Sequence, residues 1–593
     1  MCGLCGELRF DGQVANSQLI QTMSAKLERR GPDDNGIFSE GPVALGHRRL
    51  AIIDLSSESH QPMHIPELGL SIVFNGSIYN YPDLRKQLQA MGHQFFSHGD
   101  TEVILRAYAE WGDDFVKRLH GMFAFAIWDR SKQHLLMARD RMGIKPLYYS
   151  LNNKRLRFAS TPQALLAGKD IDTAVDPVGL HHQLTLHAVI PAPHTILRGI
   201  RKLKPAHTVK VAVDGTLTEQ RYWTLKATRP TQSMSESDWI TATHDTLKRA
   251  VKKRLEVADV PVGVLLSGGL DSSLLVGLLA EAGVTGLRTF TVGFEDQPEE
   301  KGNEYEYSDP VAERFCTEHA KFHIANEELI DRLPDAIGAM SEPMVAQDAV
   351  AFYLLAEQVS KEIKVVQSGQ GADEVFGGYF WYPQMQAESS GSKLERFRKH
   401  YFDRSHQEWL DAIEPAFHTE DITSQRVAQL LNEPAADEFI DRVLHMDITT
   451  LIVDDPVKRV DNMTMAWGLE ARVPFLDHEL VELAASMPPE LKLRQGGKYP
   501  LKAIARGLLP DKVIDREKGY FPVPALKFVR GRFLDMMQDT LHSAACRQRG
   551  LFNQRYIETL LQAPEQHMTA LKGSKLWHLA LLEMWLQMHV DTG

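Results

Sequence analysis

Short apolar runs separated by turn residues dominate the first part of the chain. Runs of this kind, bounded by Gly, Pro, Asn and Asp, are typical of β-strands. Fewer stretches show the helical spacing of apolar residues. The strand-like runs are 4–10, 43–55, 70–80, 122–129, 134–140 and 156–160, and the helical ones are 17–27, 81–92 and 101–112. Many strands with few helices predict an α+β sandwich, in which two sheets lie between layers of helices (αββα).

The pattern changes after a polar stretch at 228–237. Helices then dominate, and the strands become continuous apolar runs at 260–266, 288–294 and 363–369. Such strands alternating with helices are typical of an α/β fold with a doubly wound parallel sheet. We therefore predict three segments. They are a first domain at 1–215, a linker at 216–237 and a second domain at 238–593.

Composition narrows the class of protein. The chain has 593 residues, 43% of them hydrophobic, and a net charge of −12. No basic run is dense enough to follow a phosphate backbone, so nucleic acid is not the expected partner. No apolar run approaches the roughly 18 residues of a membrane span, and we predict a cytoplasmic protein. Four cysteines are too few and too scattered for a disulfide framework or a zinc site.

The first candidate for chemistry is Cys2, which follows Met1. Removal of Met1 would leave a thiol and a free α-amine on the same residue. An α-amine has a pKa near 8, so it can accept a proton close to neutral pH. One residue could then supply both nucleophile and base. A cysteine at this position also arises by chance, so the interpretation depends on the other motifs.

The second candidate is the loop Ser267–Ser273, which follows an apolar strand and opens a helix. Its glycines allow backbone N–H groups to turn inward, and its serines supply hydroxyl donors. A helix N-terminus favours anions. This combination predicts a pyrophosphate-binding loop, although no Gly-Lys-Ser/Thr of a Walker A motif follows. Asp271 could hold Mg²⁺ against phosphate oxygens. An ordinary turn is the alternative reading of the motif.

A related loop, Ser368–Glu374, follows the strand at 363–369. The carboxyl ends of parallel strands are where α/β sheets bind ligands. Asp373 in this loop could therefore be a second Mg²⁺ ligand that faces Asp271.

Together these motifs give the chain a resemblance to the glutamine-hydrolysing asparagine synthetase family over essentially its whole length. The matching segments, in chain order, are Met1–Gly3, Arg29–Asp33, His47–Leu50, Asn75-Gly76, Gly99–Val103, Ser267–Ser273, Ser368–Glu374 and Glu470–Asp477. The resemblance implies a class II (N-terminal nucleophile) glutaminase followed by a PP-loop ATP-pyrophosphatase. It also implies that ATP and Mg²⁺ activate a carboxylate as an acyl-adenylate. Ammonia from the glutaminase then arrives through an internal channel.

The resemblance assigns roles at the first site. Cys2 would attack glutamine, while the Asn75 side chain and the Gly76 N–H would form an oxyanion hole. The glutamine-binding residues would be Arg49, backbone groups near Ile53, Asn75 and Asp100. Arg49 would pair with the α-carboxylate and Asp100 with the α-ammonium.

The resemblance also assigns roles at the second site. ATP would contact Leu265, Ser267, Gly269, Asp271, Ser272, Val292, Ser368 and Gly369. Asp271 and Asp373 would hold Mg²⁺. Lys502 would neutralise charge in the adenylation transition state, acting as a point charge on phosphates.

Two departures from the family pattern bear on the substrate. Ser77 and Gln370 stand where the family usually has carboxylates. A glutamine carries no charge at pH 7, so the loss at 370 predicts an acceptor other than aspartate. With the Cys-Gly-Leu-Cys-Gly start, these changes resemble the branch that amidates N-acetylglutaminylglutamine, an osmoprotectant dipeptide. Aspartate, as in an asparagine synthetase, is the alternative acceptor.

Two further classes of function stay open. One is an adenylating ligase with an inactive glutaminase, against which the intact Cys2, Arg49, Asn75 and Asp100 argue. The other is a non-catalytic binding or regulatory protein, against which Asp271 and Asp373 argue. The partners that we expect are small molecules, with no nucleic acid and no membrane. The sequence does not determine the oligomeric state, and a homodimer is left open.

Overall fold

The first domain is built from two six-stranded antiparallel sheets. The computed structural model describes residues 2–296, 301–516 and 523–591. The first sheet has the strand order β10-β8-β9-β1-β3-β2, and the second has the order β12-β11-β7-β6-β5-β4. The strands of the first sheet are β1 Gly3–Arg9, β2 Asp34–Glu40, β3 Val43–Arg49, β8 Tyr148–Leu151, β9 Arg155–Ala159 and β10 Arg201–Lys202. Those of the second are β4 Met63–Ile65, β5 Leu70–Ile78, β6 Gly121–Asp129, β7 His134–Arg139, β11 His207–Ala212 and β12 Leu217–Arg221.

The two sheets pack face to face, with helices on their outer faces. Leu4 and Leu45 of the first sheet share one buried cluster with Val73 and Met137 of the second. The other face of the second sheet packs against α2 and α3, and the other face of the first sheet packs against α1. The helices of this domain are α1 Ser17–Ala25, α2 Tyr81–Ala90, α3 Asp100–Trp111, α4 Phe115–Arg118, α5 Pro162–Ala167 and α6 Pro177–Thr185. The layers are those of the predicted αββα sandwich.

The second domain contains a five-stranded parallel sheet with the order β15-β14-β13-β16-β17. Its strands are β13 Val262–Leu265, β14 Arg288–Phe294, β15 Glu318–Ile324, β16 Val365–Gln367 and β17 Glu470–Arg472. Strands β14 and β15 are added on one side of β13, and strands β16 and β17 are then added on its other side. The crevice between β13 and β16 is therefore a topological switch point, where doubly wound sheets bind ligands. Both predicted phosphate-site loops follow these two strands.

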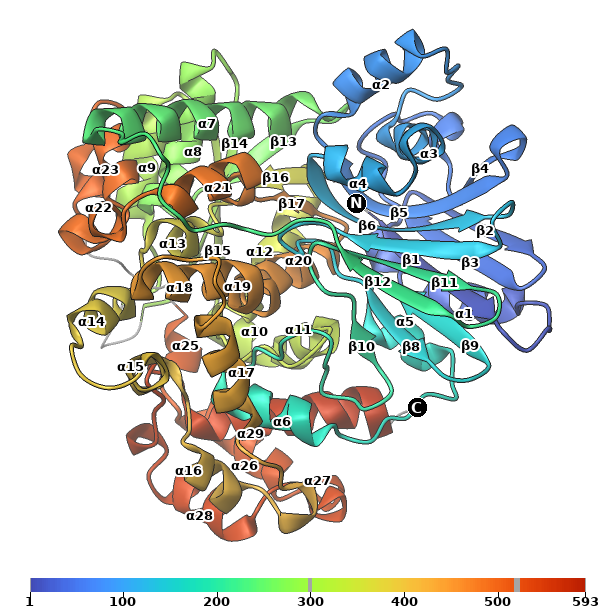
Figure 1. Ribbon diagram of the computed structural model, residues 1–593. Helices are drawn as coiled ribbons and strands as arrows, with labels where there is room; N and C mark the ends of the chain where they lie inside the picture. Colours follow the sequence, from blue (N-terminus) through green and yellow to red (C-terminus); the bar gives the residue numbers. More distant parts are fainter. Residues whose placement is uncertain (1, 297–300, 517–522, 592–593) are drawn as a thin grey trace.

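Helices surround this sheet and make up the rest of the domain (Figure 1). The helices up to the second phosphate-site loop are α7 Glu236–Glu256, α8 Leu270–Glu281, α9 Tyr305–Arg314, α10 Asn326–Asp331, α11 Leu333–Ala339, α12 Asp348–Ser360 and α13 Ala372–Phe376. The next are α14 Trp381–Ala387, α15 Lys393–Tyr401, α16 His406–Ala412, α17 Ile422–Leu431, α18 Phe439–Met446, α19 Ile452–Asp454 and α20 Pro456–Met465. The last are α21 His478–Ser486, α22 Pro489–Leu493, α23 Tyr499–Ala505, α24 Asp511–Ile514, α25 Pro524–Lys527, α26 Gly531–Leu541, α27 Ala544–Arg549, α28 Gln554–Gln562 and α29 Lys575–Leu586.

Two segments extend the first domain beyond the boundaries or the sandwich that the sequence predicted. Strand β12 falls inside the predicted linker 216–237, so the second sheet of the sandwich extends beyond residue 215. All five residues of β12 are exposed at the edge of the sheet, which is why the segment lacks an apolar strand pattern. Helix α6 leaves the sandwich and packs on α16 and α17 of the second domain, near α29 (Figure 1).

Buried ion pairs join the two domains. Asp461 on α20 accepts hydrogen bonds from Arg30 at 3.0 Å and from Lys145 at 2.9 Å, and all three side chains are buried. Lys202 likewise lies 2.7 Å from Asp454. Removing one partner of such a pair leaves an uncompensated buried charge, which costs about 3–5 kcal/mol. These contacts therefore fix one arrangement of the two domains.

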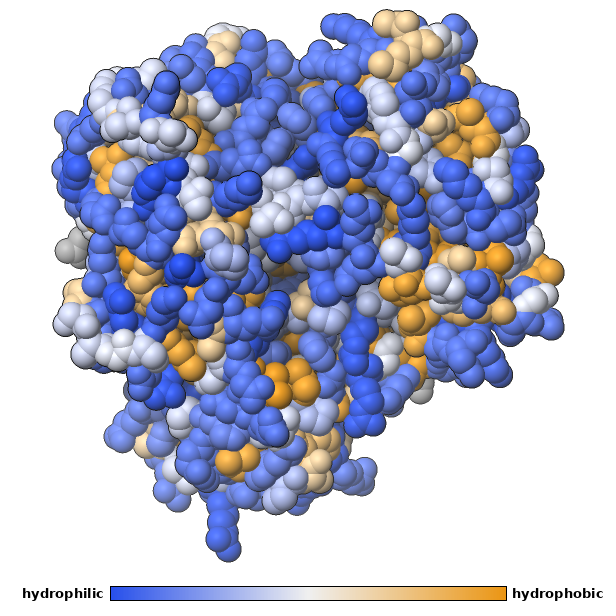
Figure 2. Space-filling view, in the orientation of Figure 1, coloured by the Kyte–Doolittle hydropathy of each residue, from blue (hydrophilic) through white to orange (hydrophobic). Residues whose placement is uncertain are grey.

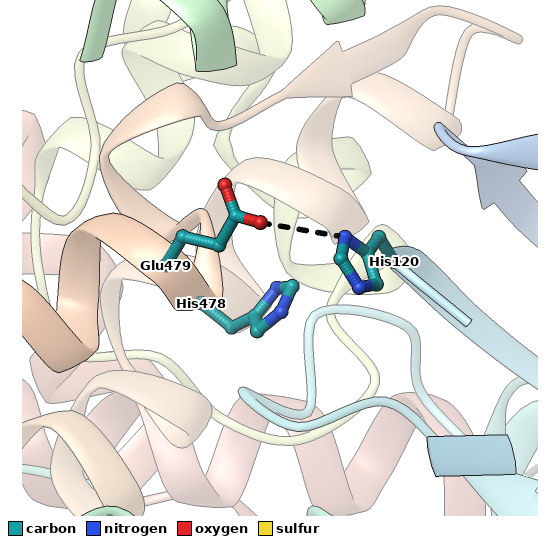
Figure 3. A group of neighbouring side chains, drawn as sticks. All are labelled: His120, His478 and Glu479. Atoms are coloured by element: carbon teal, nitrogen blue, oxygen red, sulfur yellow. Dashed lines mark ion pairs between the residues drawn. The ribbon is translucent and has the colours of Figure 1, made fainter. Parts of the chain in front are cut away.

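A half-exposed contact at the start of α21 adds to this interface (Figure 3). His120 of the first domain lies 3.8 Å from Glu479, measured from Nδ1 to Oε1. Its ring stands edge-on to the ring of His478, with centroids 4.4 Å apart. Elsewhere, the face of the molecule seen in Figure 2 is mostly hydrophilic with smaller hydrophobic patches. Among the described residues, we find no helix whose length and apolar character would suffice to span a membrane.

Candidate active sites

The first site forms where the two sheets of the sandwich meet at Cys2. This residue precedes β1, and its backbone nitrogen donates a 3.0 Å hydrogen bond to the Asn75 Oδ1 of β5. Burial raises the pKa of the Cys2 thiol, while a hydrogen bond from the Leu50 backbone and the charge of Arg49 partly offset that rise. Cys2 is 7% exposed, so it is buried. Met1 is outside the described residues.

Asn75, one of the two residues assigned to the oxyanion hole, lies beside this cysteine, and Gly76 follows it on β5. The Asn75 Nδ2 atom is buried and has no hydrogen-bond partner among the described residues. An unpaired buried donor is costly, so its presence suggests a ligand oxygen. At position 76, a Cβ atom would lie 2.2 Å from the Met122 carbonyl oxygen, which only glycine avoids. Donors fixed in this way can stabilise developing negative charge.

Arg49 ends β3, and its guanidinium is held in the loop that follows. It donates to the carbonyl of Ser56 at 3.0 Å and also to the carbonyls of Ile53 and Asp54. Asp100, at the start of α3, accepts a 3.0 Å hydrogen bond from the Ile78 N–H and is 5% exposed. Burial raises the pKa of Asp100 to about 6. The carboxylate has no cationic ion-pair partner among the described residues, so a ligand ammonium would be well placed there.

Ser77, the first departure from the family pattern, is buried next to a cation of the second domain. Arg472 on β17 approaches the Ser77 hydroxyl at 3.5 Å and pairs with Glu470 at 2.5 Å. The same guanidinium donates to the carbonyls of Arg254 and Val257. The segment Glu470–Asp477 contributed to the family resemblance, but its role at this interface was not predicted.

The second site is a cavity of about 960 Å³ in the second domain. This volume is at the upper end of the range for small-molecule sites. It contains every residue that the motifs assigned to ATP and Mg²⁺. These are Leu265, Ser267, Gly269, Asp271, Ser272, Val292, Ser368, Gly369 and Asp373.

The loop between β13 and α8 has the form of an anion cradle. Gly268 has φ +74°, and a Cβ atom there would lie 2.7 Å from the Ser308 nitrogen. The Ser267 and Ser272 hydroxyls are 3.1 Å apart, and the Ser267 hydroxyl accepts the Gly269 N–H at 3.3 Å. Helix α8 begins directly after this turn, so its N-terminus adds a favourable field for phosphate.

Asp271 and Asp373 both face the ammonium of Lys498, a residue that the sequence analysis did not assign. The Lys498 Nζ atom lies 2.6 Å from Asp271 and 2.8 Å from Asp373. Burial alone would lower the pKa of Lys498, but the two carboxylates outweigh burial and raise it. Two carboxylates this close together suit Mg²⁺, which prefers hard oxygen ligands. The lysine would then share the site with the ion and the phosphates.

Lys502 lies on the same cavity but not beside the aspartates. Its Nζ atom donates to the Gln495 carbonyl at 2.5 Å. Burial, followed by the charge of Lys498, lowers the pKa of Lys502. Gln370, the second departure from the family pattern, also lines the cavity, and its side chain makes no hydrogen bond with the rest of the described chain.

Three other groups of side chains in the described part of the chain have the composition of metal ligands. In each group the ligand atoms lie within 4.8 Å of one another. In the group around His181, both ring nitrogens of that residue already bind Thr423 and His406. The other two groups are His120, His478 and Glu479 (Figure 3), and His187, Asp403 and His578.

Comparison with known proteins assigns each of the two domains to a family. Residues 1–223 match the glutamine amidotransferase domain family, and residues 242–587 match the asparagine synthase family. The asparagine synthetase [glutamine-hydrolyzing] 3 of Bacillus subtilis (strain 168) is 34% identical over 544 residues, covering 88% of this chain and 87% of that protein. The asparagine synthetase [glutamine-hydrolyzing] 1 of the same organism is 31% identical, covering 100% of this chain and 97% of that protein.

Among solved structures, the glutamine phosphoribosylpyrophosphate amidotransferase of B. subtilis, complexed with ADP and GMP, is 15% identical with a TM-score of 0.30. The match covers 56% of this chain and 92% of the amidotransferase chain.

The fold and the matches define a glutamine amidotransferase of the ligase class, which forms C–N bonds. The chain belongs to the asparagine synthase family. The predicted family is therefore confirmed. Its N-acetylglutaminylglutamine branch stays a prediction, because the relatives are named asparagine synthetases.

Proposed function

We propose that this enzyme transfers the amide nitrogen of glutamine to a carboxylate, which it first activates with ATP. The observation that carries this proposal is the pairing of two separate sites in one chain. A buried cysteine lies beside an unpaired amide donor in one domain, and two aspartates face one cation at the switch point of a parallel sheet in the other. The first site suits ammonia release and the second suits chemistry on phosphates.

At the first site, the Cys2 sulfur would attack the side-chain amide carbon of glutamine. The Asn75 Nδ2 atom and the Gly76 N–H would stabilise the resulting oxyanion. The α-amine of Cys2, free once Met1 is removed, would take the thiol proton and pass it to the leaving ammonia. Water would then hydrolyse the thioester to glutamate. Arg49 would hold the α-carboxylate of glutamine, and Asp100 would hold its α-ammonium.

At the second site, an oxygen of the acceptor carboxylate would attack the α-phosphorus of ATP, and pyrophosphate would leave. Asp271 and Asp373 would hold Mg²⁺, which would supply positive charge to the phosphate oxygens. Lys498 would add a fixed cation to the same region, and it is a better candidate than Lys502 because it contacts both aspartates. Ammonia would attack the acyl carbon of the adenylate, and AMP would leave.

The acceptor that we propose is N-acetylglutaminylglutamine. Gln370 supports it, since this cavity residue lacks the charge that the family usually places there. The cavity volume of about 960 Å³ also accommodates a substrate larger than an amino acid beside the nucleotide. Aspartate is the second candidate, and the names of the relatives favour it. An inactive glutaminase is disfavoured because Cys2, Asn75 and Asp100 are all present and Cys2 contacts Asn75.

An acceptor comparison tests this proposal. The enzyme receives glutamine and Mg²⁺-ATP with either aspartate or N-acetylglutaminylglutamine at equal concentration, and AMP release is followed. We expect faster release with the dipeptide and a product that carries a terminal carboxamide. Aspartate proving tenfold better, about 1.4 kcal/mol in transition-state stabilisation, would make the enzyme an asparagine synthetase. Release of ADP and phosphate would contradict the adenylation chemistry.

A further inference from the structure

One end of the nucleotide cavity is built by a residue of the first domain. His187, just after α6, lines the same cavity as Ser267 and Asp373. The segment 571–574, which precedes α29, lines it too. Figure 1 shows α6 and α29 near each other and well away from β13 and α8, which flank the phosphate loop. The cavity therefore extends beyond the nucleotide loops to a region where the two domains meet.

His187 is held there by an aspartate behind it. Its Nδ1 atom lies 3.3 Å from Oδ2 and 3.4 Å from Oδ1 of Asp403, a fully buried carboxylate. On the other side of that carboxylate is His578, whose Nδ1 atom is 3.5 Å from Oδ2. Burial lowers the pKa of His578 to about 3, so this ring is neutral. His187 is therefore the imidazole that balances the charge of Asp403.

The charge state of His187 follows from this contact. Burial alone would lower the pKa of His187, but the charge and hydrogen bond of Asp403 outweigh burial and raise it. The ring thus keeps a proton more readily than a free imidazole. Its Nε2 atom makes no hydrogen bond with any other part of the described chain. The contact with Asp403 therefore favours an N–H donor at the cavity wall.

The backbone around His187 is strained into this position. His187 has φ +52° and Ala188 has φ +62°, so two consecutive side-chain-bearing residues are left-handed. Such conformations persist only where the surroundings impose them, and they are common at ligand sites. Here the second domain imposes them. The Asp403 N–H donates to the Thr185 carbonyl at 2.9 Å, and Arg404 donates to the Leu184 carbonyl at 3.1 Å.

The other cations at this end of the cavity are already engaged or exposed. Arg459 pairs with Asp455 at 2.6 Å and with Asp348 at 3.2 Å. Lys572 is exposed and lies over the ring of Phe380. Asp447, an acidic residue that also lines the cavity, already accepts a hydrogen bond from Tyr382. His187 is thus the residue at this end of the cavity that is best placed to donate a hydrogen bond to a ligand oxygen.

We propose that His187 binds the acceptor through an oxygen that does not take part in the reaction. In aspartate this oxygen belongs to the α-carboxylate, and in an acylated dipeptide it is an amide or acyl carbonyl. Asp403 is a positioning residue that orients the imidazole and favours its protonated form. This inference rests on the proposed function. It adds that the first domain completes the acceptor site of the second.

Steady-state kinetics of AMP formation test this assignment, with ammonia replacing glutamine as nitrogen donor. The variant His187→Asn tolerates a left-handed backbone but is too short to present its amide to the cavity. We expect the acceptor KM to rise about 10- to 100-fold, as for the loss of a charge-assisted hydrogen bond. The KM for ATP should change less than twofold.

Asp403→Asn should also raise the acceptor KM, but by a smaller factor than His187→Asn. The increase should be larger for aspartate than for the dipeptide, since aspartate offers a charged oxygen.

The matched control is His194→Gln. His194 also pairs with an aspartate, Asp176 at 3.2 Å, and belongs to the same segment, but it does not line the cavity. Both KM values of the control should equal those of the wild type. Thermal melting identifies any variant that fails to fold, and His187→Gln then replaces His187→Asn in the comparison.

The outcomes separate this inference from the proposed function. An unchanged acceptor KM in folded His187 variants would overturn the inference while the proposed function stands. A raised ATP KM with an unchanged acceptor KM would place His187 at the nucleotide instead, and the inference would fail. If the wild type released no AMP with either acceptor, the proposed function and this inference would fall together.

Discussion

The two sites of this enzyme differ in how they prepare for their ligands. Around Cys2, the buried Asn75 Nδ2 atom has no hydrogen-bond partner among the described residues, and the buried Asp100 carboxylate has a backbone N–H donor but no cation beside it. In the nucleotide cavity, the aspartates already have a cation, because Lys498 lies against both of them. The first site is buried. The second is a cavity of about 960 Å³ in which one lysine partly offsets the charge of two aspartates before a polyanion enters.

This difference shows what each site has to overcome. Glutamine brings one ammonium and one carboxylate, so single opposite charges suffice to bind it. ATP brings several negative charges, and two bare aspartates would repel it. Lys498 brings one positive charge against these two negative ones, so it reduces that repulsion in the free protein and can later interact with phosphate. The comparison leads to four predictions, given from the largest expected effect to the smallest.

The largest effect should follow removal of the carboxylates of the nucleotide cavity. Asp271→Asn and Asp373→Asn each replace a charged Mg²⁺ ligand by a neutral amide. Pyrophosphate release should fall below detection, about 1000-fold or more, as expected when stabilisation of over 4 kcal/mol is lost. Glutamine hydrolysis, measured as glutamate formation, should continue in both variants. Loss of glutamate formation in folded variants would show that the sites are not separable.

A somewhat smaller effect should distinguish the two lysines. Lys498→Ala should lower the rate of pyrophosphate release by about 100-fold or more, because a fixed charge at the phosphates is lost. Lys502→Ala, which removes a lysine bound to a backbone carbonyl, should lower it less than tenfold. The rates are compared at saturating ATP and acceptor. A greater loss in Lys502→Ala would restore the original assignment of Lys502.

Within the cysteine pocket, Asn75→Ala should lower kcat for glutamine hydrolysis about 100- to 1000-fold, the usual cost of one oxyanion donor. The ammonia-dependent reaction should be unaffected, since the second site does not use this amide. Glutamate formation and ammonia-dependent AMP formation are measured on the same preparation. Equal losses in both reactions would indicate a folding defect or a shared role.

The smallest effect concerns pH. Burial raises the pKa of Asp100 to about 6 in the free protein. The carboxylate is therefore charged above about pH 6 and protonated below it, and binding of the glutamine ammonium should weaken as the pH falls through 6. The KM for glutamine should rise by up to about tenfold per pH unit below this point. Asp100→Asn should have a high KM that no longer depends on pH in this range. A wild-type KM that stays flat down to pH 5 would contradict the assigned role of Asp100.

Motif residues near one another in the sequence also lie near one another in the structure, and the roles assigned to them stay predictions. Asn75 and Gly76 occupy adjacent positions on β5, and Ser267 to Ser272 form one turn, so local sequence determines their geometry. The αββα layers and the parallel sheet also followed from apolar patterns. Edge strand β12 did not, because all of its residues are exposed.

The sequence analysis did not assign Lys498 or His187, which we propose as site residues, because their positions depend on backbone detail or on distant segments. Lys498 and Lys502 are four positions apart in one motif, and sequence alone does not separate them. The left-handed backbone of Lys498, with φ +57°, precedes α23 and accompanies its contacts with the two aspartates. His187 lies far along the chain from the nucleotide motifs, and only the packing of α6 on the second domain brings it to the cavity.

The account rests on a division of labour between two sites, and Cys2→Ala tests that division most directly. The variant removes the thiol and leaves the nucleotide cavity unchanged. AMP and amide product are measured with the same acceptor and Mg²⁺-ATP, once with glutamine and once with ammonia. We predict that the glutamine-dependent reaction disappears and that the ammonia-dependent reaction keeps its wild-type rate within about twofold. Loss of both reactions in a variant with wild-type thermal stability would contradict the account.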